Sequence, residues 1–372
     1  MTVIYVAANR GDIGGGEVML LRLATALTEL GYDVRVVAPS TPDTLAVEAR
    51  ASGLVVEEVP CRDRVTYARG LRRWDRSRQG DRAGALWCNG LLPAVATAGR
   101  RSRLLHLHQL PVGVRRWLAT LARPRTLAVV VPSAFMASRL WAGTYVLPNW
   151  TGGDLGAPGE AGTRAAAGGD SVTVGYLGRI GRSKGVDVLA TACGLLDGPT
   201  RARIELLLAG DARFMPRGDR ATVAGAIARA RIPVTQPGWL GRHEFFSRVD
   251  VAVFPSVWDE PFGLVAAEAM EARCPVIVSD AGALPEVVGP DHPWVVPAGD
   301  PAALANVIAT AVGELPADEL TAAQRRRWEA EYSPHAGRRH LQELVVQLVG
   351  GGVLEAPSHN DDSPASSSGA AS

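Results

Sequence analysis

Two glutamates, Glu260 and Glu268, are the residues whose type and spacing most directly suggest chemistry. They follow the short apolar run 251–254, which is typical of a buried strand, and a loop that contains two prolines. From Gly263 onward the residue types favour a helix. The first N–H groups of a helix lack partners within it and carry partial positive charge, so this order of elements predicts an anion-binding site.

The two carboxylates flank this predicted anion site. Glu260 precedes the helix, and Glu268 lies about one and a half turns inside it. A carboxylate repels a phosphate but accepts hydrogen bonds from hydroxyl groups. The layout therefore suits a nucleotide-sugar, in which a pyrophosphate separates a ribose from a hexose. The alternative is that Glu260 is an ordinary loop charge and that Glu268 belongs to a solvated helix face.

The same segment resembles the retaining GT-B glycosyltransferases of family 4, whose E-x7-E signature is matched by Glu260 and Glu268 with Pro-Phe-Gly after the first glutamate. The resemblance covers about residues 1–349. It implies an α/β fold with two Rossmann-like domains that face an interdomain cleft. It also implies transfer of a hexosyl group, of glucosyl or N-acetylglucosaminyl type, to a hydroxyl acceptor with retention. Glu260 would then accept the hexose hydroxyls, and Glu268 the ribose hydroxyls.

A basic motif follows the predicted strand 172–177, where Arg179 and Lys184 precede a helix expected near Val186. Lys184 is the single lysine among 39 basic residues, which suggests a site that needs a compact ammonium group. In the family, an arginine and a lysine at this spacing are directed at the donor diphosphate, where negative charge accumulates as the glycosidic bond breaks. Exposed surface charges are the alternative. The resemblance implies that the same diphosphate is held by the backbone of Gly263, Leu264 and Val265.

A glycine-rich turn lies in the predicted strand–helix–strand unit within residues 2–38. It is not the dinucleotide fingerprint, because Met19 occupies the position of the third glycine, and an NAD enzyme is therefore disfavoured. The family has a Gly-Gly-x-Glu turn here, matched by the run from Gly14 to Glu17, and the resemblance implies that this turn faces the reacting phosphate and the acceptor, with Gly15 and Gly16 as its functional residues. We also expect at least one glycine of the turn to need a positive φ.

The apolar run 103–110 contains two histidines and predicts a buried strand that continues into a loop. His106 and His108 are expected on one face of that strand. No nearby carboxylate or cysteine completes a metal site. The resemblance implies that His108 contacts the donor sugar, with His106 as the second choice and otherwise a core residue. It also places the nucleotide base near Trp239.

The length of 372 residues predicts two domains. Residues 146–150 resemble the turn that closes the first domain in the family, with Asn149 in a structural role. The expected divisions are an acceptor domain at 1–150, a Gly/Ala-rich linker at 151–170, a nucleotide-sugar-binding domain at 171–330, a helix returning to the first domain at 331–349, and a disordered tail at 350–372.

Composition excludes several classes of function. The net charge of +1 gives no reason to expect a nucleic-acid partner. There is no apolar run of about 18 residues and no basic-then-apolar leader, so we expect a cytoplasmic chain. The four cysteines lack C-x-x-C spacing, and residues 1–355 contain no Asp-x-Asp metal clamp. We therefore expect no metal and no cofactor. The resemblance implies a nucleotide-sugar as the donor substrate, with a uracil base (UDP) as the first choice and guanine or adenine as the other choices.

The arginine-rich segment 62–82 holds eight arginines and three aspartates, with Tyr67 and Trp74 among them. A solvated helix face or a mobile loop is the first interpretation, and an acceptor-binding or membrane-surface patch is the second. The acceptor itself is not identified by the sequence, so aminocyclitols, cell-wall precursors and polysaccharides all stay open. A GT-B nucleotide-sugar epimerase and a catalytically silent homologue that acts as a binding partner are the two alternatives to a transferase. The oligomeric state is also open.

Overall fold

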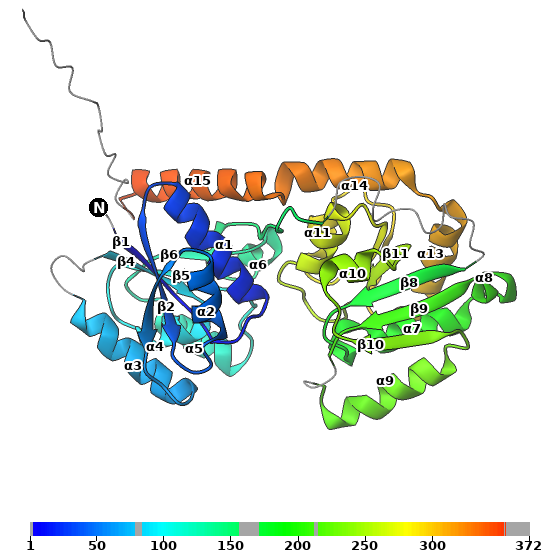
Figure 1. The fold of residues 1–372 in the computed structure, drawn as a ribbon, viewed down its shortest axis with the longest axis horizontal. Coiled ribbons are helices and arrows are strands. Elements are labelled where there is room, and N and C mark those ends of the chain that lie inside the picture. The colour runs from blue at the N-terminus through cyan, green and yellow to red at the C-terminus, as the bar shows by residue number, and fades with distance from the viewer. Residues whose placement is uncertain (1–2, 79–83, 156–170, 212–214, 353, 355–372) are drawn as a thin grey trace, which may run out of the picture. The chain divides into compact units, whose positions relative to one another are not determined.

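The computed structural model describes residues 3–78, 84–155, 171–211, 215–352 and 354 (Figure 1). Most of the predicted linker, 156–170, and most of the predicted tail, 355–372, lie outside these residues. In the described ranges, no helix is long and apolar enough to cross a membrane.

The chain divides into two compact units, each containing part or all of one parallel sheet. The first unit contains residues up to His106, the segment Arg115–Ala128 and the chain from Leu341 onward. The second contains Leu107–Val114 and Val129–His340. In this division the segments 107–114 and 129–150 group with the second unit, although the strands Thr126–Val131 and Tyr145–Val146 belong to the first sheet.

The first sheet has seven strands in the order β3-β2-β1-β4-β5-β6-β7. Its strands are β1 (Val3–Ala7), β2 (Asp33–Pro39), β3 (Val55–Val59), β4 (Gly84–Asn89), β5 (Arg103–His106), β6 (Thr126–Val131) and β7 (Tyr145–Val146). The intervening helices are α1 (Gly15–Glu29), α2 (Thr44–Ala51), α3 (Arg64–Ser77), α4 (Leu91–Ala96), α5 (Val114–Ala122) and α6 (Ala134–Ser138). β1 pairs in parallel with both β2 and β4, so the strand order reverses between β1 and β4.

The second sheet has six strands in the order β10-β9-β8-β11-β12-β13, and it reverses between β8 and β11. Its strands are β8 (Val172–Leu177), β9 (Ile204–Ala209), β10 (Val234–Gly238), β11 (Val251–Phe254), β12 (Val276–Ser279) and β13 (Val295–Val296). The helices of this half are α7 (Val186–Leu195), α8 (Gly198–Ala202), α9 (Arg217–Arg229), α10 (Arg242–Phe246), α11 (Leu264–Glu271), α12 (Leu284–Val288), α13 (Pro301–Glu314), α14 (Asp318–Glu331) and α15 (Pro334–Gly350), with a single 3-10 turn, η3 (Arg182–Lys184).

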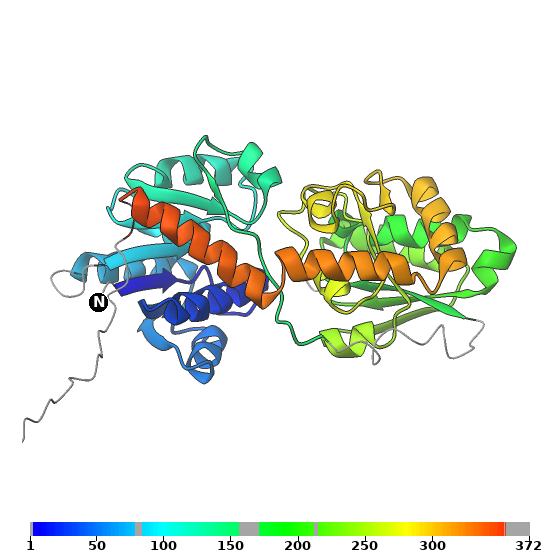
Figure 2. The same ribbon diagram turned by 90° about the horizontal axis from the view of Figure 1, so that it is seen from above.

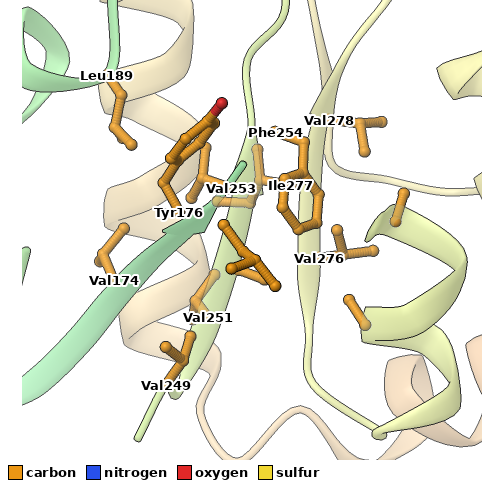
Figure 3. Packing of buried hydrophobic residues seen from close by; sticks show 14 of the residues in the cluster. Val174, Tyr176, Leu189, Val249, Val251, Val253, Phe254, Val276, Ile277 and Val278 are labelled. Carbon is orange, nitrogen blue, oxygen red and sulfur yellow. The ribbon is translucent and has the colours of Figure 1, made fainter. Parts of the chain in front are cut away.

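The central strands of the second sheet are apolar at nearly every position because helices cover both faces of a parallel sheet. All four residues of β11 and all four of β12 are buried. Figure 3 shows how their valines and Phe254 pack with Val174 and Tyr176 of β8 and Leu189 of α7. This packing fixes the ends of β8 and β11, from which the loops of the candidate site emerge.

The last part of the described chain forms two successive helices, α14 and α15 (Figure 2). The break falls at Tyr332 and Ser333, immediately before Pro334, which cannot continue the preceding helix. Two hydrogen bonds fix the break, because the Thr151 amide donates to the Tyr332 carbonyl at 2.9 Å and Trp328 Nε1 donates to Thr151 Oγ1 at 2.8 Å. The chain leaving the first sheet is thus attached to α14.

Gly175, in the middle of β8, tests how tightly this sheet is packed. A Cβ at this position would lie 2.3 Å from Val249 Cγ2 and 2.9 Å from Phe245 Cζ. We predict that Gly175→Ala lowers the free energy of unfolding by about 1–3 kcal/mol, because a close-packed core has no room for the methyl group. Urea unfolding would measure the change. The control Gly198→Ala, in α8 with no neighbour within 4 Å of its Cβ, should leave stability equal or slightly higher; equal effects of the two changes would contradict the prediction.

Candidate functional site

The candidate site lies at the carboxyl ends of β8 and β11, the two strands between which the order of the second sheet reverses. In open parallel sheets, ligands bind outside the strand ends at this switch point. The loop after β8 carries Lys184, and the loop after β11 carries Glu260. The strand order therefore brings together two residues that are 76 positions apart in the sequence.

Lys184 and Glu260 form an ion pair between Nζ and Oε1. Their side chains are only 18% and 11% exposed, so both charges have lost most of their contact with water. Ser256 Oγ donates a second hydrogen bond to the same Glu260 oxygen at 2.6 Å. The ammonium group also lies 5.0 Å from the ring centroid of Trp258, a distance at which a cation–π contact is attractive. Glu260 is therefore not a solvated loop charge.

Two glycines permit the loops to approach one another closely enough for this pair. Gly185 has a φ of +69°, and a Cβ there would lie 1.8 Å from the Pro255 carbonyl oxygen. Gly282 has a φ of +67°, and a Cβ there would lie 2.3 Å from the backbone nitrogen of Glu260. Backbone hydrogen bonds then fix the two contacts, from Val257 to the Ser183 carbonyl at 3.1 Å and from Ala283 to the Glu260 carbonyl at 2.9 Å.

Glu268 lies inside α11 and is only 5% exposed, so it does not belong to a solvated helix face. Arg242, the first residue of α10, places Nη1 3.3 Å from Glu268 Oε1. The same guanidinium group places Nη2 3.1 Å from a carboxylate oxygen of Asp154. Arg242 thus balances the charge of Glu268 and links it to Asp154.

The amino end of α11 lies between the two glutamates in sequence. Gly263, which precedes the helix, has a φ of +97°, and a Cβ there would lie 2.5 Å from Leu284 Cδ2. The Gly263 carbonyl accepts from the Ala266 amide at 2.9 Å. The amides of Leu264 and Val265 belong to the first turn, where a helix offers no carbonyl partner. They are therefore suited to hold an anion.

Two other predicted residues, Arg179 and Trp239, lie on loops at the same edge of the sheet. Arg179 follows β8 with an exposed side chain, and its carbonyl accepts from Tyr176 Oη at 2.7 Å. Trp239 follows β10 and is 68% exposed. The structure thus places both side chains where a ligand could reach them, without fixing either one.

The two histidines have different environments, because β5 ends at His106 and His108 lies beyond the strand. The expectation that both lie on one strand face is therefore wrong. His106 is 2% exposed, and its Nδ1 accepts from Trp87 Nε1 at 3.3 Å, which gives it a core position. Dense packing around His108 lowers its pKa to about 4, so its imidazole is neutral at neutral pH.

The glycine-rich turn begins α1 in the first unit, with Gly15 and Gly16 as its first two residues. None of the three consecutive glycines has a positive φ, so the expectation of such a conformation is wrong. A Cβ at Gly15 would meet no atom within 4 Å, which leaves open space in front of the helix. Glu17 is buried 3.6 Å from Arg10, and desolvation raises its pKa despite that arginine.

The closing turn of the first domain contains Asn149, for which a structural role was expected. Its Oδ1 is buried and accepts no hydrogen bond from any residue that the structure describes. The neighbouring Trp150 is 3% exposed, and its ring would lie 2.2 Å from a Cβ at Gly337. The tryptophan of this turn therefore packs closely against Gly337 of α15.

The arginine-rich segment 62–82 contains α3, so over Arg64–Ser77 it is a helix rather than a mobile loop. Its aromatic residues point inward. Tyr67 is 2% exposed and its hydroxyl donates to the Ala8 carbonyl at 2.9 Å, while Trp74 Nε1 donates to Glu57 at 2.7 Å. Asp75 is buried between Arg78 and Arg100 at 2.6 and 3.0 Å. Several groups of the predicted patch therefore hold the helix on its unit.

Sequence reasoning did not assign roles to four residues that shape this site. Ser256 and Trp258 stand in the loop between the run 251–254 and Glu260, so their proximity to Glu260 in sequence was a usable signal. Gly282 lies 22 residues after Glu260, and its contact with the Glu260 backbone depends on the tertiary structure. Arg242 gave no signal, because it precedes its partner Glu268 by 26 residues on a different helix. In the described ranges, no group of three or more His, Cys, Asp or Glu side chains could hold a metal ion.

Comparisons with known proteins match both halves of the chain. A family model described as "Glycosyl transferases group 1" matches residues 171–314, and one described as "Glycosyltransferase Family 4" matches residues 13–149. The structure of Anabaena Alr3699/HepE in complex with UDP-glucose matches with a TM-score of 0.77 at 18% identity, covering 94% of this chain and 100% of that one. At this identity the likeness shows the fold.

Two curated relatives match in sequence over a shorter span. The alpha-maltose-1-phosphate synthase of Mycobacterium tuberculosis is 35% identical over 193 residues, covering 48% of this chain and 46% of the relative. The D-inositol 3-phosphate glycosyltransferase of Streptomyces avermitilis is 34% identical over 166 residues, covering 41% and 35%. The chain thus matches about half the length of the first relative and about a third of the second.

The buried ion pair leads to a stability prediction. Lys184→Met should lower the free energy of unfolding by about 3 kcal/mol, because it leaves the Glu260 charge buried without its partner. The double variant Lys184→Met/Glu260→Gln should be more stable than the sum of the two single changes indicates, since neither charge is then left alone. Urea unfolding of the four proteins would measure the coupling. Additive single changes would show that the pair is not coupled.

Proposed function

The chain belongs to the group 1, family 4 type of glycosyltransferases, and we propose that it is a retaining hexosyltransferase that uses a nucleotide-sugar donor without a metal ion. The observed fold, with two parallel sheets and their helices, agrees with the GT-B fold expected for this type. The observation that carries the proposal is the buried Lys184–Glu260 pair beside the amino end of α11, with Glu268 on the same helix.

The donor would be held by complementary charges in the second unit. Its diphosphate would accept hydrogen bonds from the amides of Leu264 and Val265 and from Arg179 and Lys184. An ammonium group has three donors, so Lys184 can bind a phosphate oxygen and still donate to Glu260. These fixed cations would stabilise the negative charge that develops on the leaving diphosphate in the transition state, and they would thereby lower the barrier to breaking the glycosidic bond.

The sugar hydroxyls would be bound by carboxylates. We propose that Glu260 accepts the hexose hydroxyls and that Glu268 accepts the ribose hydroxyls, with Trp239 near the base. His108, being neutral at neutral pH, would contact the hexose by hydrogen bonding without adding charge. The acceptor would bind in the open space in front of Gly15 and Gly16. The acceptor hydroxyl would attack from the face of the leaving group, and the departing phosphate oxygen would take its proton.

The identities of donor and acceptor are narrower proposals. The Anabaena structure contains UDP-glucose, which supports a UDP-linked donor. The relative named D-inositol 3-phosphate glycosyltransferase supports a cyclitol-type acceptor, beside cell-wall and polysaccharide precursors. Two alternatives make different predictions. A nucleotide-sugar epimerase would convert the donor without any acceptor, and a silent homologue would bind no nucleotide. Measurements of nucleotide binding and of the reaction product therefore distinguish both from a transferase.

Nucleotide affinity tests the donor site. A thermal-shift panel with UDP, GDP, ADP and their hexose conjugates should give a raised midpoint with one nucleotide, since a ligand stabilises the state that it binds. Calorimetry with that nucleotide should then show that Glu268→Ala binds at least about tenfold more weakly than the wild type, because the ribose hydroxyls lose a charged acceptor. Arg248→Ala, which removes an exposed pair with Glu244, is the control and should bind normally. Unchanged affinity of Glu268→Ala would remove this assignment.

The stereochemistry of the product tests the proposed reaction. Incubation of an α-linked UDP-hexose with a cyclitol or sugar acceptor should give an α-linked product, identified by the coupling constant of its anomeric proton in NMR. The reaction should proceed equally in EDTA, because Lys184 and Arg179 replace a metal ion. A β-linked product would contradict retention, and an epimerised donor in the absence of acceptor would favour the isomerase.

A further inference from the structure

Helix α5 (Val114–Ala122), labelled in Figure 1, carries an apolar face whose large side chains are exposed. Only two of its residues, Ala119 and Ala122, are fully buried. Its larger apolar side chains are exposed, with Val114 at 76%, Trp117 at 73%, Leu118 at 37% and Leu121 at 61%. The helix therefore rests on its unit through small alanines and directs its large apolar groups outward.

The spacing of these four residues places them on a single stripe. They stand at i, i+3, i+4 and i+7, which is the apolar face of an amphipathic helix. In soluble proteins such a stripe normally faces the core, where each large side chain loses contact with water. Here the core side is occupied by Ala119 and Ala122, so the stripe is unpartnered. A contiguous exposed apolar patch of this kind marks an interaction surface.

Positive charge surrounds the stripe. Arg115 and Arg116 lie on the same helix and are exposed. In sequence, residues 82–153 contain nine arginines and no aspartate or glutamate, although the chain as a whole is nearly neutral. Within this region Arg100 pairs with Asp75 and Arg103 is fully buried, but Arg123 and Arg125, which follow α5, are exposed and add to the positive charge near the helix. A partner surface with negative charge would complement it.

We propose that α5 docks this protein on an anionic lipid surface, with Trp117, Leu118 and Leu121 inserted at the headgroup boundary. A short helix with arginines beside an apolar, tryptophan-containing face has the composition of an interfacial anchor. A second copy of the chain fits less well, because pairing of two such faces would bring arginines of like charge together. The segment 62–82 is not the docking surface, since Tyr67 and Trp74 are already engaged inside their unit.

Vesicle flotation of the full-length protein tests this proposal and needs no donor or acceptor. The probes are phosphatidylcholine vesicles with and without 30% phosphatidylglycerol, at low and high salt. The wild type should float with the anionic vesicles and lose part of its binding at high salt. The variant Trp117→Ser/Leu121→Ser should bind at least about tenfold less, because it removes the inserted side chains. Arg115→Gln/Arg116→Gln should lose mainly the preference for anionic vesicles.

The control Val47→Ser/Val346→Ser removes two apolar side chains that are 55% and 64% exposed on α2 and α15. It should float like the wild type, and thermal unfolding should show that all variants are folded. Equal flotation of the α5 variant and the wild type would overturn the proposal, as would no flotation of the wild type. Conversion of a wild-type dimer to a monomer by the α5 variant, measured by light scattering, would instead assign the face to self-association. Failure of the glycosyltransferase proposal would change none of these results.

Discussion

The candidate site depends on one interaction, the ion pair between Lys184 and Glu260 at the ends of β8 and β11. Removing two charges from water is costly, and their attraction compensates only where the geometry is good and other hydrogen bonds satisfy the remaining groups. Ser256 and Trp258 supply such contacts here. The pair can form only because Gly185 and Gly282 let three loops touch through their backbones. A charge pair in this state is weak support for stability and is better suited to binding a ligand that carries both phosphates and hydroxyls.

The topology of the second sheet gives this pair its position. Strands β8, β9 and β10 succeed one another in one direction, and β11 then begins on the other side of β8. The loops after β8 and β11 therefore leave adjacent strand ends and meet above them, and the first turn of α11 begins between Glu260 and Glu268. The apolar packing of these strands, shown in Figure 3, keeps the strand ends fixed. Binding groups carried by loops thus gain precision from a rigid sheet.

Charge is distributed unevenly along a chain whose net charge is +1. Near the arginine-rich α3, Asp75 pairs with Arg78 and Trp74 donates to Glu57, so part of that helix serves its own attachment. The neighbourhood of α5 lacks such acids in sequence and carries exposed apolar groups instead. Two segments that both combine arginines with aromatic residues therefore have different environments, because the aromatic residues of α3 are engaged inside their unit whereas Trp117 of α5 is exposed.

The sequence by itself determined the strand–helix alternation, the buried character of the central strands and the motif residues near the second switch point. These follow from local patterns, because parallel strands covered on both faces are continuously apolar and a helix start has its own signals. The resemblance added the family, which the comparisons bear out. Only the tertiary structure decided that Arg242 pairs with Glu268, that β5 ends at His106 and that α5 exposes its apolar face. Each of these depends on contacts between segments distant in the chain or on which face of an element is covered, and a local pattern contains neither.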